Sequence, residues 1–386
     1  MNRIAIFLAA LCVLVLSACV TPPRGSAPPS SIMDAAPPGF APSNRVGGGT
    51  VESRLAAATR FIERLETASD GSIEILSLSR GGAGGAFGAG VLVGLSQSGT
   101  RPKYEIVTGV STGALIAPFA FLGSEWDAQL ADAYTDQTTD GFLRMRGLGA
   151  LFLPGIFRNE PLRQLIERFI TPELQAAVAR EDARGRLLLV VTTNLDSGAA
   201  IVWDMGAIAR RGETSLPLFR NILLASASVP AVFPPVMITV EAAGSRFQEM
   251  HVDGGVTMPF LLLPDLASLW LEPHPALRGA RAFVIVNGRV DAVADETPRN
   301  TLSIMARSFD VNQMVQTRDA LAVAATFAER NAMDVRFTHV PEDFPFDGAL
   351  DVDRAVMLAL YQRGLALAAS GMVWQSVPEY LRQRGE

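Results

Sequence analysis

Residues 104–122 read YEIVTGVSTGALIAPFAFL, and this stretch decides the fold. It begins with the β-branched and aromatic residues of a strand, turns through G-x-S-x-G, and ends in an apolar helix. A strand that turns directly into a helix is typical of an α/β sheet. Gly109 and Gly113 permit the strained turn that lifts the hydroxyl of Ser111 above the sheet, at the amino end of the helix. In this context the sequence favours a nucleophile over a capping serine.

The same order of strand, glycine turn and helix precedes this stretch. Residues 73–78 (IEILSL) predict a strand, residues 80–85 (RGGAGG) a loop, and residues 86–95 a helix. Such a loop can aim backbone amides at an anion, either in a dinucleotide site or in an oxyanion hole. The serine turn downstream favours the oxyanion hole, because both loops would lie at the carboxyl ends of adjacent strands. The next strand also lacks the acidic residue that would hold a ribose.

The remainder of the chain continues the alternation of strands and helices. Further strands are expected at 187–193, 250–252 and 282–286, and further helices at 51–67, 163–170, 174–180, 304–330 and 353–370. The pattern predicts an α/β fold, a three-layer sandwich with a central, mostly parallel sheet. We expect a single domain over residues 51–386, with a motif-bearing core at 73–270 and a mainly helical C-terminal extension at 271–386.

The composition excludes several classes of protein. The 386 residues are 49% hydrophobic, which is too apolar for a disordered chain. With 33 basic and 39 acidic side chains the formal charge is −6, so there is no basic surplus for a nucleic-acid partner. The two cysteines, Cys12 and Cys19, cannot form a disulfide framework or a cysteine-rich zinc site.

The first residues have the features of an export signal. Residues 1–18 contain one basic residue, an apolar run too short to span a bilayer, and small residues at its end. The sequence LSAC at 16–19 resembles the lipobox of bacterial lipoproteins, which implies a lipid on Cys19 and an envelope membrane as partner and location. The alternative is an ordinary signal peptide with a chance cysteine. Residues 19–50, rich in Pro, Gly and Ser, predict a flexible tether.

A serine nucleophile needs a base, and the chain contains three histidines, His251, His274 and His339. A Ser-His-Asp triad with His339 is one interpretation, although no neighbouring motif supports it. The alternative is a Ser–Asp dyad in which Asp253 accepts the proton directly. Asp253 follows a predicted strand and precedes Gly254 and Gly255 in an Asp-Gly-Gly motif.

Together these motifs resemble the patatin-like phospholipases. That family has a glycine-rich oxyanion loop, a G-x-S-x-G turn and an Asp-Gly-Gly or Asp-Gly-Ala motif, and the stretch ASASVPAVFPP at 225–235 is also similar. The resemblance implies a lipid acyl hydrolase acting through an acyl-enzyme, with Ser111 as nucleophile and Asp253 as proton acceptor. It places the oxyanion hole at the amides around Gly81, Gly82 and Ala83. The chemistry requires no metal or other cofactor, and the sequence contains no metal-ligand motif.

The chain departs from the family pattern in its oxyanion loop. The family loop starts with glycine and carries a basic residue before its last glycine, whereas here Arg80 stands first and Gly84 stands at the later place. The departure keeps open a non-catalytic, lipid-anchored binding or scaffolding protein that retains the fold. An α/β-hydrolase esterase that uses His339 is the third possibility.

Overall fold

The computed structural model describes most of the chain. The described ranges are residues 24–29, 35–47, 51–68, 71–135, 157–263, 272–294, 296–346 and 348–385. Residues 1–18 and Cys19, predicted as signal and lipid site, lie outside these ranges. No helix in the described ranges is long and apolar enough to cross a bilayer.

Five parallel strands form the middle of the sheet. In spatial order they are β4 (Leu187–Asn194), β3 (Ile106–Val110), β2 (Glu74–Leu78), β8 (Arg281–Val286) and β9 (Asp334–His339). Nearly all of their residues are buried, as expected for parallel strands that are covered on both faces. The predicted central, mostly parallel sheet is confirmed.

Antiparallel strands complete the sheet at its margins. They are β1 (Arg45–Val46), β5 (Ala199–Asp204), β6 (Val236–Ala242), β7 (Ser245–Asp253) and β10 (Gln375–Ser376). The end of β7 pairs with β4, with Asp253 opposite Thr192, so a residue far along the chain comes to the carboxyl edge of the parallel strands.

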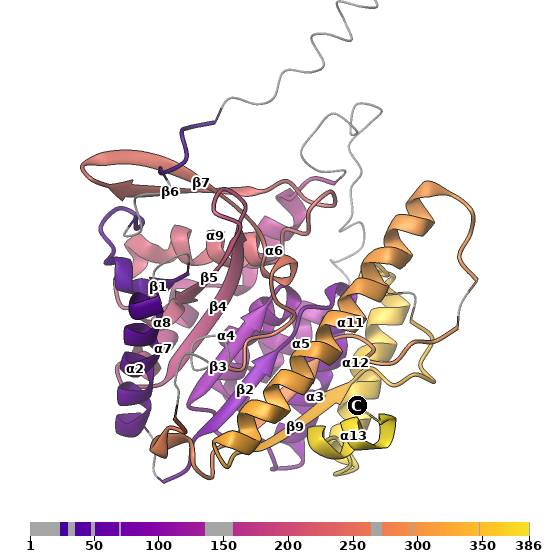
Figure 1. Ribbon diagram of the computed structural model, residues 1–386. Helices are drawn as coiled ribbons and strands as arrows, with labels where there is room; N and C mark the ends of the chain where they lie inside the picture. Colours follow the sequence, from indigo (N-terminus) through magenta and orange to yellow (C-terminus); the bar gives the residue numbers. More distant parts are fainter. Residues whose placement is uncertain are drawn as a thin grey trace, which may run out of the picture.

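Helices cover both faces of the sheet, which gives three layers (Figure 1). One face packs against α2 (Val51–Ala68), α11 (Thr301–Arg330) and α13 (Val377–Arg384). The other packs against α3 (Gly85–Gln97), α4 (Thr112–Leu122), α5 (Asp127–Thr135), α6 (Glu160–Phe169), α7 (Pro172–Asp182), α8 (Met205–Ala209), α9 (Leu216–Ser226) and α12 (Arg354–Ala369). Successive residues of a strand serve opposite layers: Ile75 faces the first group and Leu76 the second.

Short 3₁₀ helices join several of these elements. They are η1 (Pro42–Asn44), η2 (Gly82–Gly84), η3 (Ser124–Trp126), η6 (Glu213–Ser215), η7 (Gly254–Val256) and η8 (Pro275–Leu277). Of these, η2 follows β2 after three residues and η7 follows β7 directly, and both lie within glycine-rich motifs of the sequence.

Residues 271–386, predicted as a mainly helical extension, are built into the same sheet. They supply α11, α12 and α13, and also β8, which pairs with β2 in the middle of the sheet. Helix α12 lies so close to α3 that a Cβ on Gly90 would come within 2.0 Å of the carbonyl oxygen of Tyr361. Glycine is therefore required at the contact between these helices.

Part of the segment predicted as a flexible tether packs against the domain. Arg24 forms an ion pair with Asp196 at 2.9 Å, and Ala36 is buried and bridges to Glu241. Strand β1 then pairs with β5. The expectation of a flexible segment rested on composition, which does not show that this short run contains residues able to pair with a sheet edge.

Candidate active site

Ser111 lies at the sharp turn between β3 and α4. Its backbone has φ 58° and ψ −124°, a conformation that costs energy for a residue with a side chain. A Cβ on Gly109 would lie 2.5 Å from the carbonyl oxygen of Gly113, and a Cβ on Gly113 would lie 2.3 Å from that of Leu78. Both glycines are therefore needed for the close approach of strand and helix at this turn.

A neighbouring serine holds the turn in place. The amide of Ser111 donates to Oγ of Ser226 at 3.0 Å, and that hydroxyl donates to the carbonyl oxygen of Val191 at 2.6 Å. Ser226 belongs to the stretch 225–235 that supported the family resemblance. The structure thus gives this stretch a physical role, since it connects the serine turn to β4.

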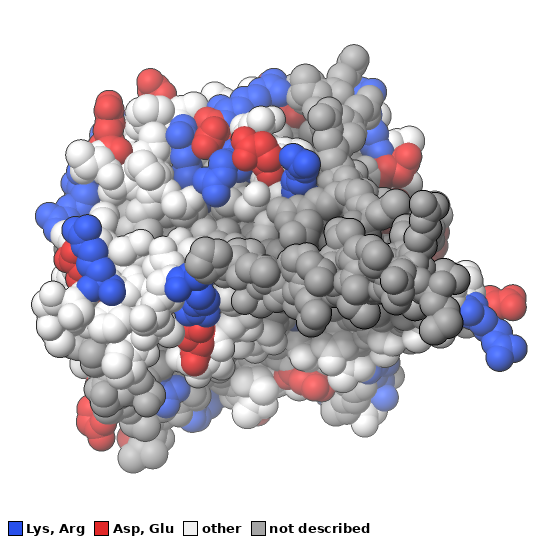
Figure 2. Space-filling view, turned by 90° about the horizontal axis from the view of Figure 1, so that it is seen from above, with Lys and Arg blue, Asp and Glu red and all other residues white. Residues whose placement is uncertain are grey.

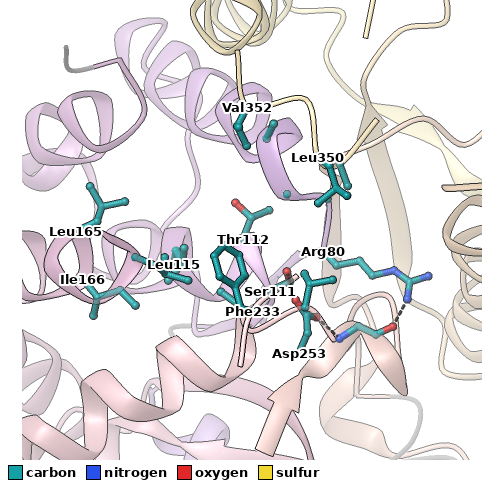
Figure 3. Close-up of a pocket in the computed structure, with 18 of the residues that line it drawn as sticks. Arg80, Ser111, Thr112, Leu115, Leu165, Ile166, Phe233, Asp253, Leu350 and Val352 are labelled. Carbon is teal, nitrogen blue, oxygen red and sulfur yellow. Dashed lines mark hydrogen bonds between the residues drawn. The ribbon is translucent and has the colours of Figure 1, made fainter. Parts of the chain in front are cut away.

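Asp253 lies directly beside Ser111. The Ser111 hydroxyl donates to Oδ2 of Asp253 at 2.6 Å, and Oδ1 accepts from the amide of Gly255 at 2.7 Å (Figure 3). The amide of Asp253 donates to the carbonyl oxygen of Ser228 at 3.0 Å, which fixes the backbone of the turn. Both side chains are only 4% exposed. The structure therefore brings together the two residues that the sequence places 142 positions apart.

Burial makes Asp253 a better base than an ordinary aspartate. Loss of water raises the pKa of its carboxyl to about 6, although the Ser111 hydroxyl, the Gly255 amide and the Arg80 guanidinium each lower that pKa. The carboxylate is thus still the main form at neutral pH. A pKa close to the working pH suits a group that must both take up and release a proton.

The glycine-rich loop follows β2 and packs tightly on two other segments. A Cβ on Gly81 would lie 1.8 Å from the carbonyl oxygen of Asn287, and one on Gly82 would lie 1.9 Å from that of Ala349. Ala83, predicted as a third oxyanion donor, instead donates its amide to the carbonyl oxygen of Ala349 at 2.9 Å. Within the described residues, the amides of Gly81 and Gly82 have no acceptor.

Arg80 supplies the positive charge nearest to Asp253. Its buried guanidinium donates to the carbonyl oxygen of Gly255, and on α11 to the carbonyl oxygen of Gln313 at 3.1 Å and to Oε1 of Gln316 at 3.0 Å. Burial lowers the pKa of Arg80 to about 10, so it stays charged at neutral pH. The charge lies beside the Asp-Gly-Gly turn, and Arg80 extends away from Ser111 (Figure 3).

A largely apolar cavity extends from Ser111. Its empty volume is about 1350 Å³, counting the open mouth. Its wall includes α4, α6, the segment after α9 and the segment before α12, and the apolar side chains come mainly from Leu115, Phe119, Leu162, Leu165, Ile166, Phe169, Ile170, Val229, Phe233, Leu350, Val352 and Met357. In Figure 3, Leu115, Leu165 and Ile166 lie at the end of the cavity away from Arg80. Acyl chains are the kind of ligand that such a wall accommodates.

The histidines serve other purposes. His251 is fully buried, with Nδ1 2.9 Å from the Thr192 hydroxyl and Nε2 3.1 Å from Glu249. His339 ends β9, three strands away from β3, which corresponds to about 14 Å across the sheet. His274 begins η8. Among the described contacts, Asp253 is the titratable side chain that reaches Ser111.

Two further properties concern metal binding and the charge of the molecular surface. In the part of the chain that the structure describes, no three His, Cys, Asp or Glu side chains are grouped so that they could hold a metal. Figure 2 shows the molecule from above, where acidic and basic side chains alternate and neither sign dominates the part that is drawn in colour.

Sequence reasoning missed the supporting residues of the site. Ser226 belongs to a motif whose sequence does not show its hydrogen bond to the Ser111 turn, and Gln313 and Gln316 carry no signal because their partner, Arg80, is more than 200 positions away. The unusual position of Arg80 in the loop was the signal that could have directed attention to them.

The fold and the turn at Ser111 define an α/β protein with a serine at a sharp strand-to-helix turn. The family model described as patatin-like phospholipase matches residues 76–264, which contain the glycine-rich loop, the elbow and Asp253. Residues 76–264 are thus similar to the patatin-like phospholipases, a family of lipid acyl hydrolases.

The sequence identity to solved structures is low. A solved structure, "Crystal structure of VipD from Legionella pneumophila", matches with 13% identity and a TM-score of 0.32, covering 80% of this chain and 68% of that chain. No curated protein matches the sequence.

Proposed function

We propose that this chain is a serine hydrolase of the phospholipase A or lysophospholipase type, which cleaves carboxylic esters of lipids through an acyl-enzyme. The observation that supports this most directly is the 2.6 Å hydrogen bond from the Ser111 hydroxyl to the buried carboxylate of Asp253. The bond lies at one end of a cavity with an apolar wall. The family match to lipid hydrolases points in the same direction.

In the proposed reaction, Asp253 accepts the hydroxyl proton while Oγ of Ser111 attacks the ester carbonyl carbon. The amides of Gly81 and Gly82 donate to the oxygen that becomes negative, and two donors suffice for an oxyanion hole. The tetrahedral intermediate collapses as Asp253 returns the proton to the departing alcohol. Water then gives a proton to Asp253 while its oxygen attacks the acyl carbon, and Asp253 passes that proton to Oγ of Ser111 as the acyl–Oγ bond breaks and the fatty acid leaves.

The apolar wall should set the length of the acyl chain. Leu165 lines the cavity from α6 and is partly exposed, so a Leu165→Trp variant can fold while its larger ring fills part of the groove. We expect kcat/KM for esters of twelve or more carbons to fall about tenfold or more, while butyrate esters change little. A series of p-nitrophenyl esters measures this effect. The matched control is Gln164→Trp, at an exposed position on the same helix, and an equal loss for short and long esters would contradict the groove.

We further propose that a lipid on Cys19 anchors the hydrolase at a bacterial envelope membrane, where esterified lipids are at hand. The support is the lipobox-like sequence at 16–19. Cys19→Ser is expected to move the protein from the membrane fraction to the aqueous fraction and to abolish incorporation of labelled palmitate, as judged by fractionation and autoradiography. Cys12→Ser is the control, because Cys12 lies in the segment that would be removed. Membrane retention of the Cys19→Ser protein would disprove this anchor.

A further inference from the structure

A second, polar hollow adjoins the apolar cavity. It has an empty volume of about 1590 Å³, counting its mouth, and lies between the first half of α11, the segment after β8 and the segment before α12. The two hollows share four lining residues, namely Arg80, Gly81, Gln313 and Ala349. A shallow depression lined by Asp310 and Leu350, among others, also adjoins both. An ester held at Ser111 therefore has an apolar space on one side and a polar space on the other.

Two arginines of the polar hollow have unused hydrogen-bond donors. Nη2 of Arg289 donates to the carbonyl oxygen of Phe344 at 2.5 Å, and Nη2 of Arg307 donates to that of Val293 at 2.8 Å. Nε of Arg289 is buried and has no hydrogen-bond partner among the residues that the structure describes. Among the described residues, no carboxylate forms an ion pair with either guanidinium. Guanidinium groups with spare donors match the geometry of a phosphate.

One carboxylate faces the same space. Asp310 lines the hollow from α11, one turn after Arg307, and its Oδ1 accepts from the amide of Ala349 at 3.4 Å. Burial raises the pKa of Asp310 to about 6, and the nearby Arg307 and Arg289 lower it, so the three charges act on one another without direct pairing. The remaining carboxylate of the lining, Asp291, is engaged by Tyr380 and Arg384. Of the charged side chains that the structure describes in this hollow, Arg289, Arg307 and Asp310 are therefore the ones outside a direct ion pair and outside the contacts of Arg80 with Gly255 and α11.

We propose that the polar hollow binds the headgroup of a glycerophospholipid whose ester lies at Ser111, with Arg289 and Arg307 on the phosphate and Asp310 on an ammonium or hydroxyl beyond it. This inference rests on the proposed function. The phosphate of such a lipid is only a few bonds from the scissile ester, and the hollow adjoins the oxyanion loop. The substrate class that fits is a phospholipid with a hydrogen-bond donor in its head, rather than a neutral glyceride or a choline lipid.

The test compares substrates with the full chain in detergent micelles. The ratio of kcat/KM for dioleoyl phosphatidylethanolamine to that for a diacylglycerol with the same chains is measured in wild type, Arg289→Met, Arg307→Met and Arg299→Met. We expect the ratio to fall about tenfold or more in the first two variants, because each loses a charged hydrogen bond. Arg299, exposed and outside the hollow, is the matched control. Arg289→Lys and Arg307→Lys, which keep the charge, should recover part of the ratio.

The role of Asp310 is tested by comparing substrates that differ only in the headgroup. Wild type is expected to prefer phosphatidylethanolamine over phosphatidylcholine by about tenfold, and Asp310→Asn to reduce that preference, because only the ethanolamine head donates a hydrogen bond. Inorganic phosphate and glycerophosphoethanolamine are compared as inhibitors of this hydrolysis. If the headgroup is the ligand, glycerophosphoethanolamine inhibits at lower concentration; equal inhibition by phosphate assigns the site to free phosphate and overturns the proposal.

The outcomes separate the two hypotheses. A wild-type protein that cleaves none of these esters contradicts the proposed function. A wild-type protein that cleaves them, but whose substrate ratio is the same in Arg289→Met and Arg307→Met, contradicts the headgroup site alone. A uniform loss on all substrates in these variants, with no recovery by lysine, assigns the arginines to structure and also overturns the site.

Discussion

Ser111→Ala is expected to lower kcat/KM for every ester substrate by at least about a thousandfold, since the variant has no nucleophile while the oxyanion donors and the cavity remain. The fold should persist because the missing hydroxyl made one hydrogen bond as a donor, to Asp253. Hydrolysis of p-nitrophenyl butyrate and tagging by a fluorescent fluorophosphonate measure the two consequences. Ser124→Ala, at an exposed serine that begins η3 just after α4, serves as the matched control.

The tagging experiment also decides between enzyme and scaffold. Covalent labelling of wild type but not of Ser111→Ala excludes the non-catalytic binding protein. A wild-type chain that takes no label favours that alternative. The alternative is worth testing because the Ala83 amide, expected as an oxyanion donor, is hydrogen-bonded to Ala349. Full activity in Ser111→Ala would reject the assigned nucleophile.

Asp253→Asn is expected to reduce kcat/KM by a similar factor, at least about a thousandfold, because the amide keeps the shape of the side chain but cannot accept the serine proton. The control is Asp132→Asn, at an exposed acidic residue. In wild type, kcat/KM should rise with pH around the Asp253 pKa of about 6, since the ionised form is the base. A pH profile that is flat between pH 5 and 8, or an active Asp253→Asn, would contradict the dyad.

Arg80 and His339 sharpen this test. The Arg80 guanidinium lowers the pKa of Asp253, so Arg80→Met should move the midpoint of the profile to higher pH. His339→Ala should remain active, because His339 ends β9, three strands away from β3 and Ser111. An inactive, folded His339→Ala protein together with an active Asp253→Asn protein would instead support an esterase with a histidine base.

The same pKa shift carries a stability cost. Asp253 has a folded pKa of about 6, above its ordinary value of 3.8, so the folded state holds this proton more tightly than the unfolded state. The free energy of unfolding contributed by this group therefore falls as pH rises from about 4 to 6, by about 3 kcal/mol in all. Asp253→Asn should remove that dependence and melt at a higher temperature than wild type at pH 7.

Much of the core could be predicted from the sequence, because strands that are buried on both faces of a sheet appear as continuous apolar runs. Residues 187–193 and 282–286 are of this kind, and they became β4 and β8. Strand β6 was missed because its residues alternate between buried and partly exposed or exposed positions on a two-stranded ribbon. Such a strand is defined by its partner β7 and not by its own apolar content.

The candidate site likewise contains residues that the sequence predicts and contacts that it does not. Gly109, Ser111 and Asp253 belong to local motifs whose backbone geometry follows from glycine, and the structure brings Ser111 and Asp253 together. The engagement of Ala83 could not be foreseen, because it depends on Ala349, more than 260 positions downstream. Contacts between segments that far apart leave no pattern in a single sequence.

The docked N-terminal segment limits how far the hydrolase can move from its anchor. If Cys19 is held at a bilayer as proposed, the five residues from Cys19 to Arg24 span at most about 17 Å. While Arg24 stays paired with Asp196, the β6–β7 ribbon, which lies at the top of Figure 1, is confined near the lipid surface. Salt that screens this ion pair would leave the segment docked, because the Gly25 amide also donates to Oε1 of Gln248 at 2.7 Å and the Gln248 amide donates to the carbonyl oxygen of Ser26 at 2.9 Å. The length of chain between Cys19 and this docked segment, and not the ionic strength, would then set the height of the enzyme above its membrane.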